Sequence, residues 1–401
     1  MRSMLKWIFL ASVVAAPAWA YPWMVKHSYG SCATCHVAPS GSGQLSQYGR
    51  AQADVLVKWR TQARKEEEEV PKSANFLWFL ELPEFLNLSG NFRYASLIRP
   101  QSSTPFIPLI MSTDLYATVN LGPIVAHVTT GVGTYSTHAI SYSGPAAIAP
   151  ICDPSLGTCS VQWLAREFWL GAKFADEAVM VRAGRMNLPF GLRNNEHTSY
   201  VRKLTRTDTN VGQQVGASAA YNSDSLRGEI MGIAGNYQLG PDAYRERGYS
   251  AFAEYSISHN AYIGLSSLIT YAAIDIQSGD PTTRHAHGAF ARVAPTEKLA
   301  LLGEADFLAW QTPQKLDRIG FAAMFQADLD LMQGLHLMGT LEAAQTSSAD
   351  PGPALGGWVS ATWYFLPHCE LRLDNIFRRN SSAGSTPSFE YDLLVQLHLF
   401  L

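Results

Sequence analysis

The stretch Cys32-Ala33-Thr34-Cys35-His36 holds the residues whose types and spacing are best suited to chemistry. It has the form C-x-x-C-H, the attachment signature of c-type haem. Two thiols at this spacing reach the two vinyl groups of one porphyrin, and the imidazole that follows lies beneath the iron. We therefore predict one haem c, attached through Cys32 and Cys35, with His36 as the proximal iron ligand.

Two other roles are open to the C-x-x-C part alone, which also occurs in redox dithiols and in zinc sites. Zinc is disfavoured because no second cysteine pair or histidine pair follows at ligand spacing. The haem reading gains support from the position of the motif near the start of an exported chain.

An electron-transfer haem usually takes a sixth iron ligand from histidine or methionine. We expect His27 or His197 to serve as this distal ligand, and Met24 is also near in sequence. His197 lies in a long loop that could fold into the interior of a barrel. The other histidines are weaker candidates, namely His127, His138, His285, His287, His336 and His398.

The three remaining cysteines lie far along the chain from the motif. Cys152 and Cys159 bracket a turn-rich stretch, so we predict a local disulfide that stiffens a surface loop. Cys369 has no partner in this scheme and is expected to be a small buried residue.

Residues 1–20 have the three parts of a bacterial signal peptide. Arg2 and Lys6 form a basic start, an apolar stretch follows, and Ala18-Trp19-Ala20 matches a cleavage signal. The mature chain is therefore expected to be exported, and its thiols to be crosslinked or attached to a cofactor.

The composition argues against several protein classes. Of the 401 residues only 16% are charged, well below the roughly 25% of soluble proteins, so much of the surface should contact something other than water. A net charge of −3 gives no basic excess for nucleic acid. No apolar run after the leader reaches the roughly 18 residues of a membrane-spanning helix. A helical membrane protein is excluded, and a β-barrel remains.

Residues 21–80 differ in character from the rest and are expected to form a monohaem cytochrome c module. A helix is predicted over residues 51–70. Such a short module cannot bury a sizeable core alone, so the haem and a neighbouring surface must supply apolar contacts.

Residues 85–401 show the two-residue period of β-strands. In the last expected strand, Leu393, Val395 and Leu397 alternate with polar residues that include Gln396 and His398. We predict about 16 antiparallel strands, because tight turns such as Gly122-Pro123 alternate with long connections, as in bacterial outer-membrane barrels. The predicted fold is thus all-β, an antiparallel transmembrane β-barrel preceded by a small helical c-type haem-binding segment.

Charged residues of both signs recur at positions predicted to face the lumen, which implies a polar interior that is wet or filled by a plug. They are Arg166, Arg182, Arg227, Glu229, Glu254, Arg292, Glu304, Asp306, Arg318, Asp328, Arg372, Asp374 and Arg378. Aromatic residues near strand ends suit interfacial girdles in the lipid, although some of them are expected to be ordinary lumen or loop residues. They are Trp163, Trp169, Trp310, Trp358, Trp363 and Tyr364.

An exported chain that opens with C-x-x-C-H and continues as a sixteen-strand barrel resembles the fused outer-membrane cytochrome-porins of iron-oxidising bacteria. The resemblance rests on the order of the parts and, at residue level, on Cys32, Cys35 and His36. Residues 27–31 and 44–50 are similar to the short monohaem modules of such fusions. The resemblance implies electron passage through the outer membrane, between an extracellular donor or acceptor such as a metal ion and a periplasmic carrier such as a cytochrome.

Three functions follow from these features. The first is an electron-transfer protein, for which outer-sphere transfer needs no acid–base residues. The second is a porin whose haem module is a plug or redox gate. The third is a haem enzyme with an open sixth position.

Overall fold

The computed structural model describes most of the chain. The described residues are 22–60, 74–103, 105–136, 159–194, 196, 199–209, 212–314, 316–348, 350, 352–380 and 388–401. Four predicted features lie outside these ranges: the signal peptide, His197, Cys152 and residues 61–70 of the predicted helix.

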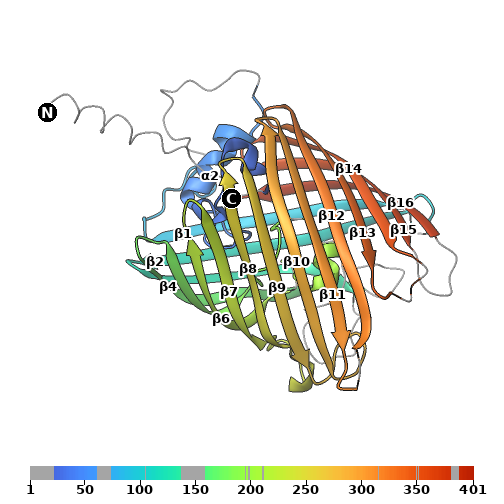
Figure 1. Cartoon of the computed structure of the whole chain (residues 1–401). Helices are drawn as coiled ribbons and strands as arrows, with labels where there is room; N and C mark the ends of the chain where they lie inside the picture. The colour runs from blue at the N-terminus through green and yellow to red at the C-terminus, as the bar shows by residue number, and fades with distance from the viewer. Residues whose placement is uncertain are drawn as a thin grey trace, which may run out of the picture.

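Sixteen antiparallel strands of the described chain form one closed barrel (Figure 1). The strands are β1 (Leu86–Ile98), β2 (Phe106–Leu121), β3 (Ile124–Ser136), β4 (Cys159–Phe174), β5 (Val179–Met186), β6 (Gln214–Asn222), β7 (Leu226–Gly235), β8 (Arg247–Ser258), β9 (Ala261–Ala272), β10 (Thr282–Thr296), β11 (Leu299–Gln311), β12 (Leu316–Met332), β13 (Leu335–Gln345), β14 (Ala354–Leu366), β15 (Cys369–Asn380) and β16 (Ser388–Phe400). Each strand pairs with its neighbours in sequence, and β1 pairs with β16 to close the sheet. Closure leaves no open strand edge, as a bilayer requires. The predicted barrel is confirmed.

The two-residue period places alternate side chains inside and outside the barrel. In β14, Trp358, Ser360 and Thr362 are buried, whereas Val359 and Trp363 are exposed. Other strands also expose large apolar side chains, for example Leu115, Leu170, Ile230, Leu265, Phe307 and Leu341. The outer surface is therefore suited to lipid.

The charged residues predicted to face the lumen are on the inside. Eleven of the thirteen are buried, and Arg318 and Arg378 are half-buried. Many of them pair with one another; Arg182, for example, lies 2.5 Å from Glu229. Pairing offsets the desolvation of charges inside a filled lumen.

The predicted aromatic girdle is wrong for four of its six residues. Trp163 and Trp363 are exposed on the outer face, but Trp169, Trp310, Trp358 and Tyr364 are buried on the lumen side. Position near a strand end did not identify the face. The two-residue alternation did, because it follows from the pleat itself.

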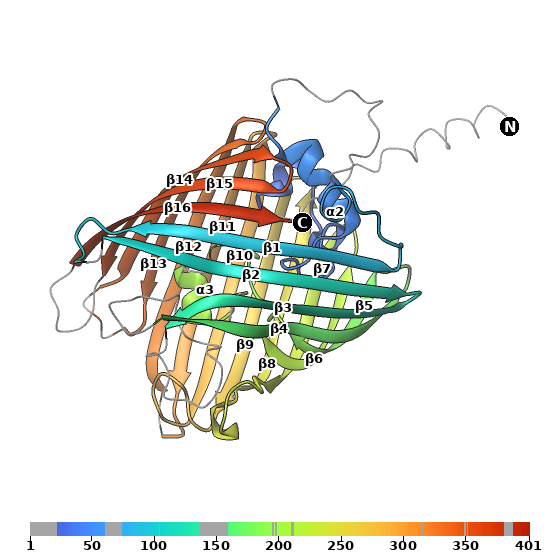
Figure 2. The ribbon, with the colours of Figure 1, turned by 180° about the vertical axis from the view of Figure 1, so that it is seen from behind.

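The two ends of the barrel differ in their connections. Short turns join β2 to β3, β4 to β5 and every second pair thereafter, whereas the opposite end carries longer connections such as residues 187–213 between β5 and β6. The N-terminal helices lie at the short-turn end, beside the end of β16 (Figures 1 and 2). In bacterial outer-membrane barrels the short turns lie at the periplasmic end.

The helices of the described chain are short. They are η1 (Pro22–His27), η2 (Cys32–Thr34), α2 (Gln47–Gln52), the π-helical turn η3 (Ala53–Val57), α3 (Tyr200–Thr205) and η5 (Asp242–Tyr244). The helix predicted over residues 51–70 instead begins at Gln47, and Lys58 is already extended. Ser46 caps its start by accepting from the Gly49 amide at 3.0 Å. No helix among the described residues is long and apolar enough to cross a membrane.

Candidate functional site

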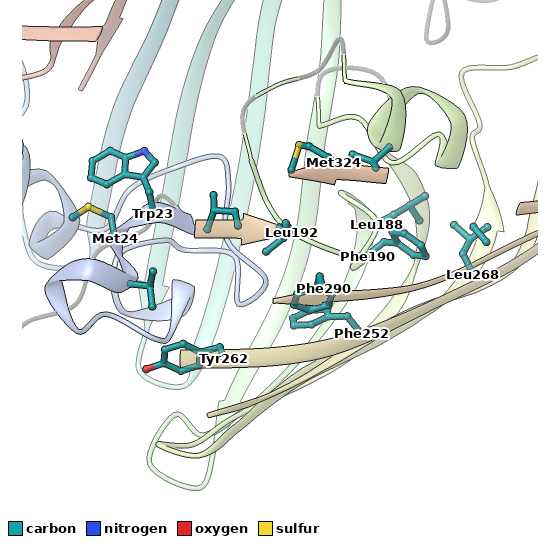
Figure 3. Packing of buried hydrophobic residues seen from close by; sticks show 14 of the residues in the cluster. Trp23, Met24, Leu188, Phe190, Leu192, Phe252, Tyr262, Leu268, Phe290 and Met324 are labelled. Carbon is teal, nitrogen blue, oxygen red and sulfur yellow. The ribbon is translucent and has the colours of Figure 1, made fainter. Parts of the chain in front are cut away.

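Residues 22–60, here called the plug segment, lie inside the short-turn end of the barrel. Trp23, Met24 and Val25 are at most 6% exposed. They belong to one apolar cluster with side chains of the barrel interior, including Tyr262 and Phe290 (Figure 3). Burial of each such side chain contributes about 1.5–3 kcal/mol, so the barrel wall supplies the core that the segment cannot form alone.

An ion-pair cluster fixes the start of the plug segment to β12. The Lys26 ammonium lies 2.5 Å from one carboxylate oxygen of Asp328 and 2.5 Å from one of Asp330. The Nδ1 atom of His336 lies 3.0 Å and 2.9 Å from the same two oxygens. We call these four residues the Lys26 anchor. Two carboxylates and an imidazole this close could hold a metal ion, but here the Lys26 ammonium supplies the positive charge between the carboxylates.

A second buried group fixes the backbone just before the C-x-x-C-H motif. Arg292 donates to both carboxylate oxygens of Glu254, at 2.8 and 2.6 Å, and to the Gly30 carbonyl at 2.8 Å. The Nε atom of Arg227 donates to Glu254 as well, and the Nη1 atom of Arg227 lies 2.9 Å from the Cys32 sulfur. We call Arg227, Glu254 and Arg292 the arginine anchor. It holds the motif against strands β7, β8 and β10.

The motif itself forms a tight turn followed by a small hairpin. The Cys35 and His36 amides donate to the Cys32 carbonyl at 3.2 and 2.9 Å. His36 then pairs with Leu45 in an isolated antiparallel bridge, and the Ser46 amide donates to the Cys35 carbonyl at 2.7 Å. Backbone bonds on both sides therefore hold the predicted proximal ligand in place.

Cys35 and His36 line a cavity between the plug segment and the barrel wall. Its volume is about 140 Å³, and its wall includes Arg93 on β1, Arg166 on β4 and His398 on β16. His36 also lines a second cavity of about 370 Å³ toward the short-turn end. The second cavity is in the range of small-molecule and cofactor sites, roughly 300–1,000 Å³, and the first is smaller.

The residues at this site fit a c-type haem in their chemistry. Cys35 offers a thiol and His36 an imidazole to one cavity, as the predicted attachment requires. The Nε atom of Arg93 is buried and has no hydrogen-bond partner among the described residues, so this guanidinium can receive a carboxylate such as a haem propionate. Cys32, as described, contacts Arg227 and lines neither cavity. Its attachment would therefore replace that contact.

The two motif thiols are suited to attachment rather than to redox exchange. Cys32 and Cys35 are both buried, and neither forms a disulfide. Burial, and to a smaller extent the neighbouring Cys32 thiol, raises the pKa of Cys35 well above its ordinary value. A reactive dithiol needs a lowered thiol pKa, so the redox-dithiol reading is disfavoured.

Gly49 permits the close contact between α2 and the motif. A Cβ atom at this position would lie 2.5 Å from the Cys35 carbonyl oxygen. We expect Gly49→Ala to displace Cys35 and to lower the haem content per barrel several-fold, measured by haem staining after denaturing electrophoresis. Gly339→Ala is the matched control, because a Cβ there meets no atom within 4 Å. Equal haem content in the two variants would contradict the assigned packing.

Neither His27 nor Met24 lines the cavities that His36 lines. The His27 imidazole lies 3.9 Å from Asp330, at the edge of the Lys26 anchor. Met24 is fully buried in the apolar cluster, and His197 lies outside the described residues. Of the other cysteines, Cys369 is buried and free, while the side chain of Cys159 is outside the described part together with Cys152.

We expect His27 to make docking of the plug segment sensitive to pH. Burial, together with the adjacent Lys26 ammonium, lowers the pKa of His27 from 6.5 to about 4. An undocked segment with an ordinary His27 pKa takes up its proton first, so docking stability is present above pH 6.5 and is lost as the pH falls toward 4.

We expect this loss to reach about 3 kcal/mol at most, at 1.36 kcal/mol for each pKa unit. The measurement is protease cleavage of the plug segment as a function of pH, compared with His27→Asn. The two proteins should differ below pH 6.5 and coincide above it. Identical profiles throughout would contradict the prediction.

The connection between β5 and β6 enters the lumen from the opposite end. Leu188, Phe190 and Leu192 join the apolar cluster (Figure 3), and α3 packs inside against β11, β12 and β13. The Leu192 amide donates to Glu304 at 3.0 Å. Arg193 donates to Ser40 at 3.3 Å, so this connection contacts the plug segment directly. The described lumen is thus occupied from both ends.

The sequence did not indicate which strands face the motif. Arg93 and His398 lie 305 positions apart yet stand opposite each other where β1 pairs with β16. The alternation of polar and apolar residues correctly placed Gln396 and His398 inside. It gave no signal for their proximity to Cys35, because that depends on barrel closure and on the docking of the plug segment.

No family model matches this chain, and no curated protein matches its sequence. Solved structures do match. The outer membrane channel DcaP of Acinetobacter baumannii has a TM-score of 0.56 at 9% identity, over 79% of this chain and 97% of that one. OmpT of Vibrio cholerae in its trimer form has a TM-score of 0.57 at 7% identity, over 79% of this chain and 99% of that one. An anion-selective porin from Comamonas acidovorans has a TM-score of 0.56 at 10% identity, over 79% of this chain and 99% of that one.

At these identities the likeness shows the fold, which is that of the sixteen-strand outer-membrane porins. It concerns the barrel, and none of the three proteins is described as a cytochrome. The haem and its attachment remain predictions from the motif and from the site geometry.

Proposed function

We propose that this chain is a porin-type barrel of the bacterial outer membrane whose lumen is closed by a plug segment carrying one haem c. The placement of Cys35 and His36 inside the end of the barrel carries the proposal, because both line one cavity against its wall. The apolar outer face and the likeness to outer-membrane channels support the location in lipid.

We further propose that the haem-bearing plug transfers electrons across the membrane. A bound haem supplies one-electron chemistry with a potential set by its axial ligands and its burial. The chain holds Cys35 and His36 on a hairpin, and the two anchors fix that hairpin to the wall. The plug segment and the inward connection contribute side chains to one apolar cluster inside the barrel.

The position of the site determines which partners can reach it. The short-turn end faces the periplasm in bacterial barrels, so a periplasmic carrier such as a cytochrome can approach His36 from that side. An extracellular donor or acceptor, such as a metal ion, must exchange its electron from the long-loop side. The apolar band is about 25 Å tall, so the lumen must bring such a substrate close to the haem.

A redox-gated porin is the second candidate function, and the likeness to channel proteins favours it. In this case the plug segment would undock when the haem changes its oxidation state and would admit solutes. The ion pairs of the Lys26 anchor are the contacts that such a motion must break.

The test uses the full-length protein in sealed vesicles that enclose an electron acceptor and a small dye. A membrane-impermeant reductant is added outside, and the absorbance of the acceptor is followed. We expect reduction of the acceptor without release of the dye, and no reduction with His36→Ala. Equal rates for the variant and the wild type would contradict electron transfer through this haem. Dye release that follows the redox state would instead establish the gate.

A further inference from the structure

We propose that His398, on the last strand of the barrel, is the sixth ligand of the haem carried by the plug segment. This inference rests on the proposed function, because it concerns the same haem. Among the described residues that line the two cavities, His398 is the one histidine besides His36. The iron would then join the plug segment to the barrel wall.

The surroundings of His398 are those of an oriented metal ligand. Its side chain is buried, and Nδ1 lies 3.1 Å from a carboxylate oxygen of Glu370. Glu370 stands directly opposite His398 in the β15–β16 ladder, so the backbone fixes the pair. Ligating histidines commonly donate their second ring nitrogen to a carboxylate, which sets the tautomer and the ring orientation.

The other ring nitrogen is directed toward the cavity wall. The Nε2 atom of His398 lies 2.7 Å from the amide oxygen of Asn91, which lines the cavity. When a neutral imidazole donates Nδ1–H to Glu370, Nε2 carries a lone pair. In that tautomer Nε2 does not donate to the Asn91 oxygen, so ligation of iron would replace the contact with Asn91.

The neighbouring Arg93 supports the same placement. It stands opposite His398 in the β1–β16 ladder and lines the same cavity. Its buried Nε has no partner among the described residues, and a haem brings two carboxylates that a guanidinium can bind. An iron ligand and a carboxylate site thus lie side by side on the wall that faces Cys35.

The experiment measures the spin state of the haem in full-length protein purified in detergent. We expect a six-coordinate low-spin absorption and paramagnetic resonance spectrum for the wild type. His398→Ala should convert it to high spin, and added imidazole should restore low spin. His398→Met should remain low spin with a thioether signature and a higher reduction potential, because methionine ligation raises the potential.

Three further variants make the test specific. His127 is the matched control, since it is buried to the same 7% in the lumen but lines neither cavity as described. His127→Ala should leave the spectrum low spin. Met180→Leu tests the thioether that lines the second cavity, and His27→Ala tests the distal ligand predicted from the sequence; neither should change the spin state.

The outcomes separate this proposal from the proposed function. A high-spin wild type, or a low-spin His398→Ala variant, would overturn ligation by His398. Loss of low spin in Met180→Leu or His27→Ala alone would assign the ligand to that residue instead. Absence of haem from the wild type would overturn the proposed function itself. If His398→Ala fails to fold, Glu370→Gln decides, because it should keep the low-spin haem yet raise its reduction potential; an unchanged potential would contradict the oriented ligand.

Discussion

Replacing Lys26 by methionine is expected to release the plug segment from the barrel. The substitution leaves the buried carboxylates of Asp328 and Asp330 without their shared cation. Removing one partner of a buried ion pair costs about 3–5 kcal/mol, which is a rise of roughly 10²- to 10⁴-fold in the undocked population. The measurements are protease cleavage of the plug segment and ion conductance in planar bilayers, and both should increase.

Lys58→Met is the matched control for this variant. Lys58 belongs to the same segment but is partly exposed and lies 3.8 Å from Asp54. Such surface pairs contribute about 0–1 kcal/mol, so cleavage and conductance should remain near wild-type values. If Lys26→Met behaves like Lys58→Met, the Lys26 anchor does not hold the segment.

Glu254→Gln is expected to disrupt the arginine anchor. Glu254 is 1% exposed and accepts from both Arg227 and Arg292. The neutral amide leaves two buried guanidinium charges without a counter-charge, at a cost of about 3–5 kcal/mol. Because these arginines contact Gly30 and Cys32, haem attachment should fall together with the unfolding temperature.

Asp242→Asn provides the comparison, since Asp242 is exposed, pairs with Arg245 and Arg247 at the surface at 2.8 and 2.7 Å, and lines neither cavity. Its haem content and unfolding temperature should match those of the wild type. The double variant Arg227→Met, Glu254→Gln removes one of the unpaired charges and should recover part of the lost stability. A double variant that is less stable than Glu254→Gln would argue against charge as the cause.

The two anchors show what the structure adds to the predicted lumen. The sequence indicated that charged residues such as Glu254 and Asp328 face inward, on the basis of alternation alone. It did not indicate that Asp328 pairs with Lys26, 302 positions away, or that Arg292 holds the backbone of Gly30. Such pairs require the plug segment to enter the barrel, which no local pattern encodes.

The expected helix and the aromatic residues illustrate the limits of local signals. The helix ends by Val57 because Lys58 is extended and the Trp59 amide donates to the Tyr364 carbonyl of the wall. Tertiary contact therefore replaced helix propensity at that point. Tyr364 was assigned to the membrane interface from its position near a strand end, yet its place in the pleat puts it inside.

The sequence by itself determined the barrel, because a two-residue period over sixteen strands leaves a closed sheet as the arrangement that pairs every backbone group in lipid. It also determined the candidate attachment residues Cys32, Cys35 and His36, since thiol and imidazole spacing is local and covalent. The tertiary structure alone decided which wall faces the motif. The cavity shared by Cys35 and His398 arises from barrel closure and plug docking, which bring together groups that the chain keeps more than 360 residues apart.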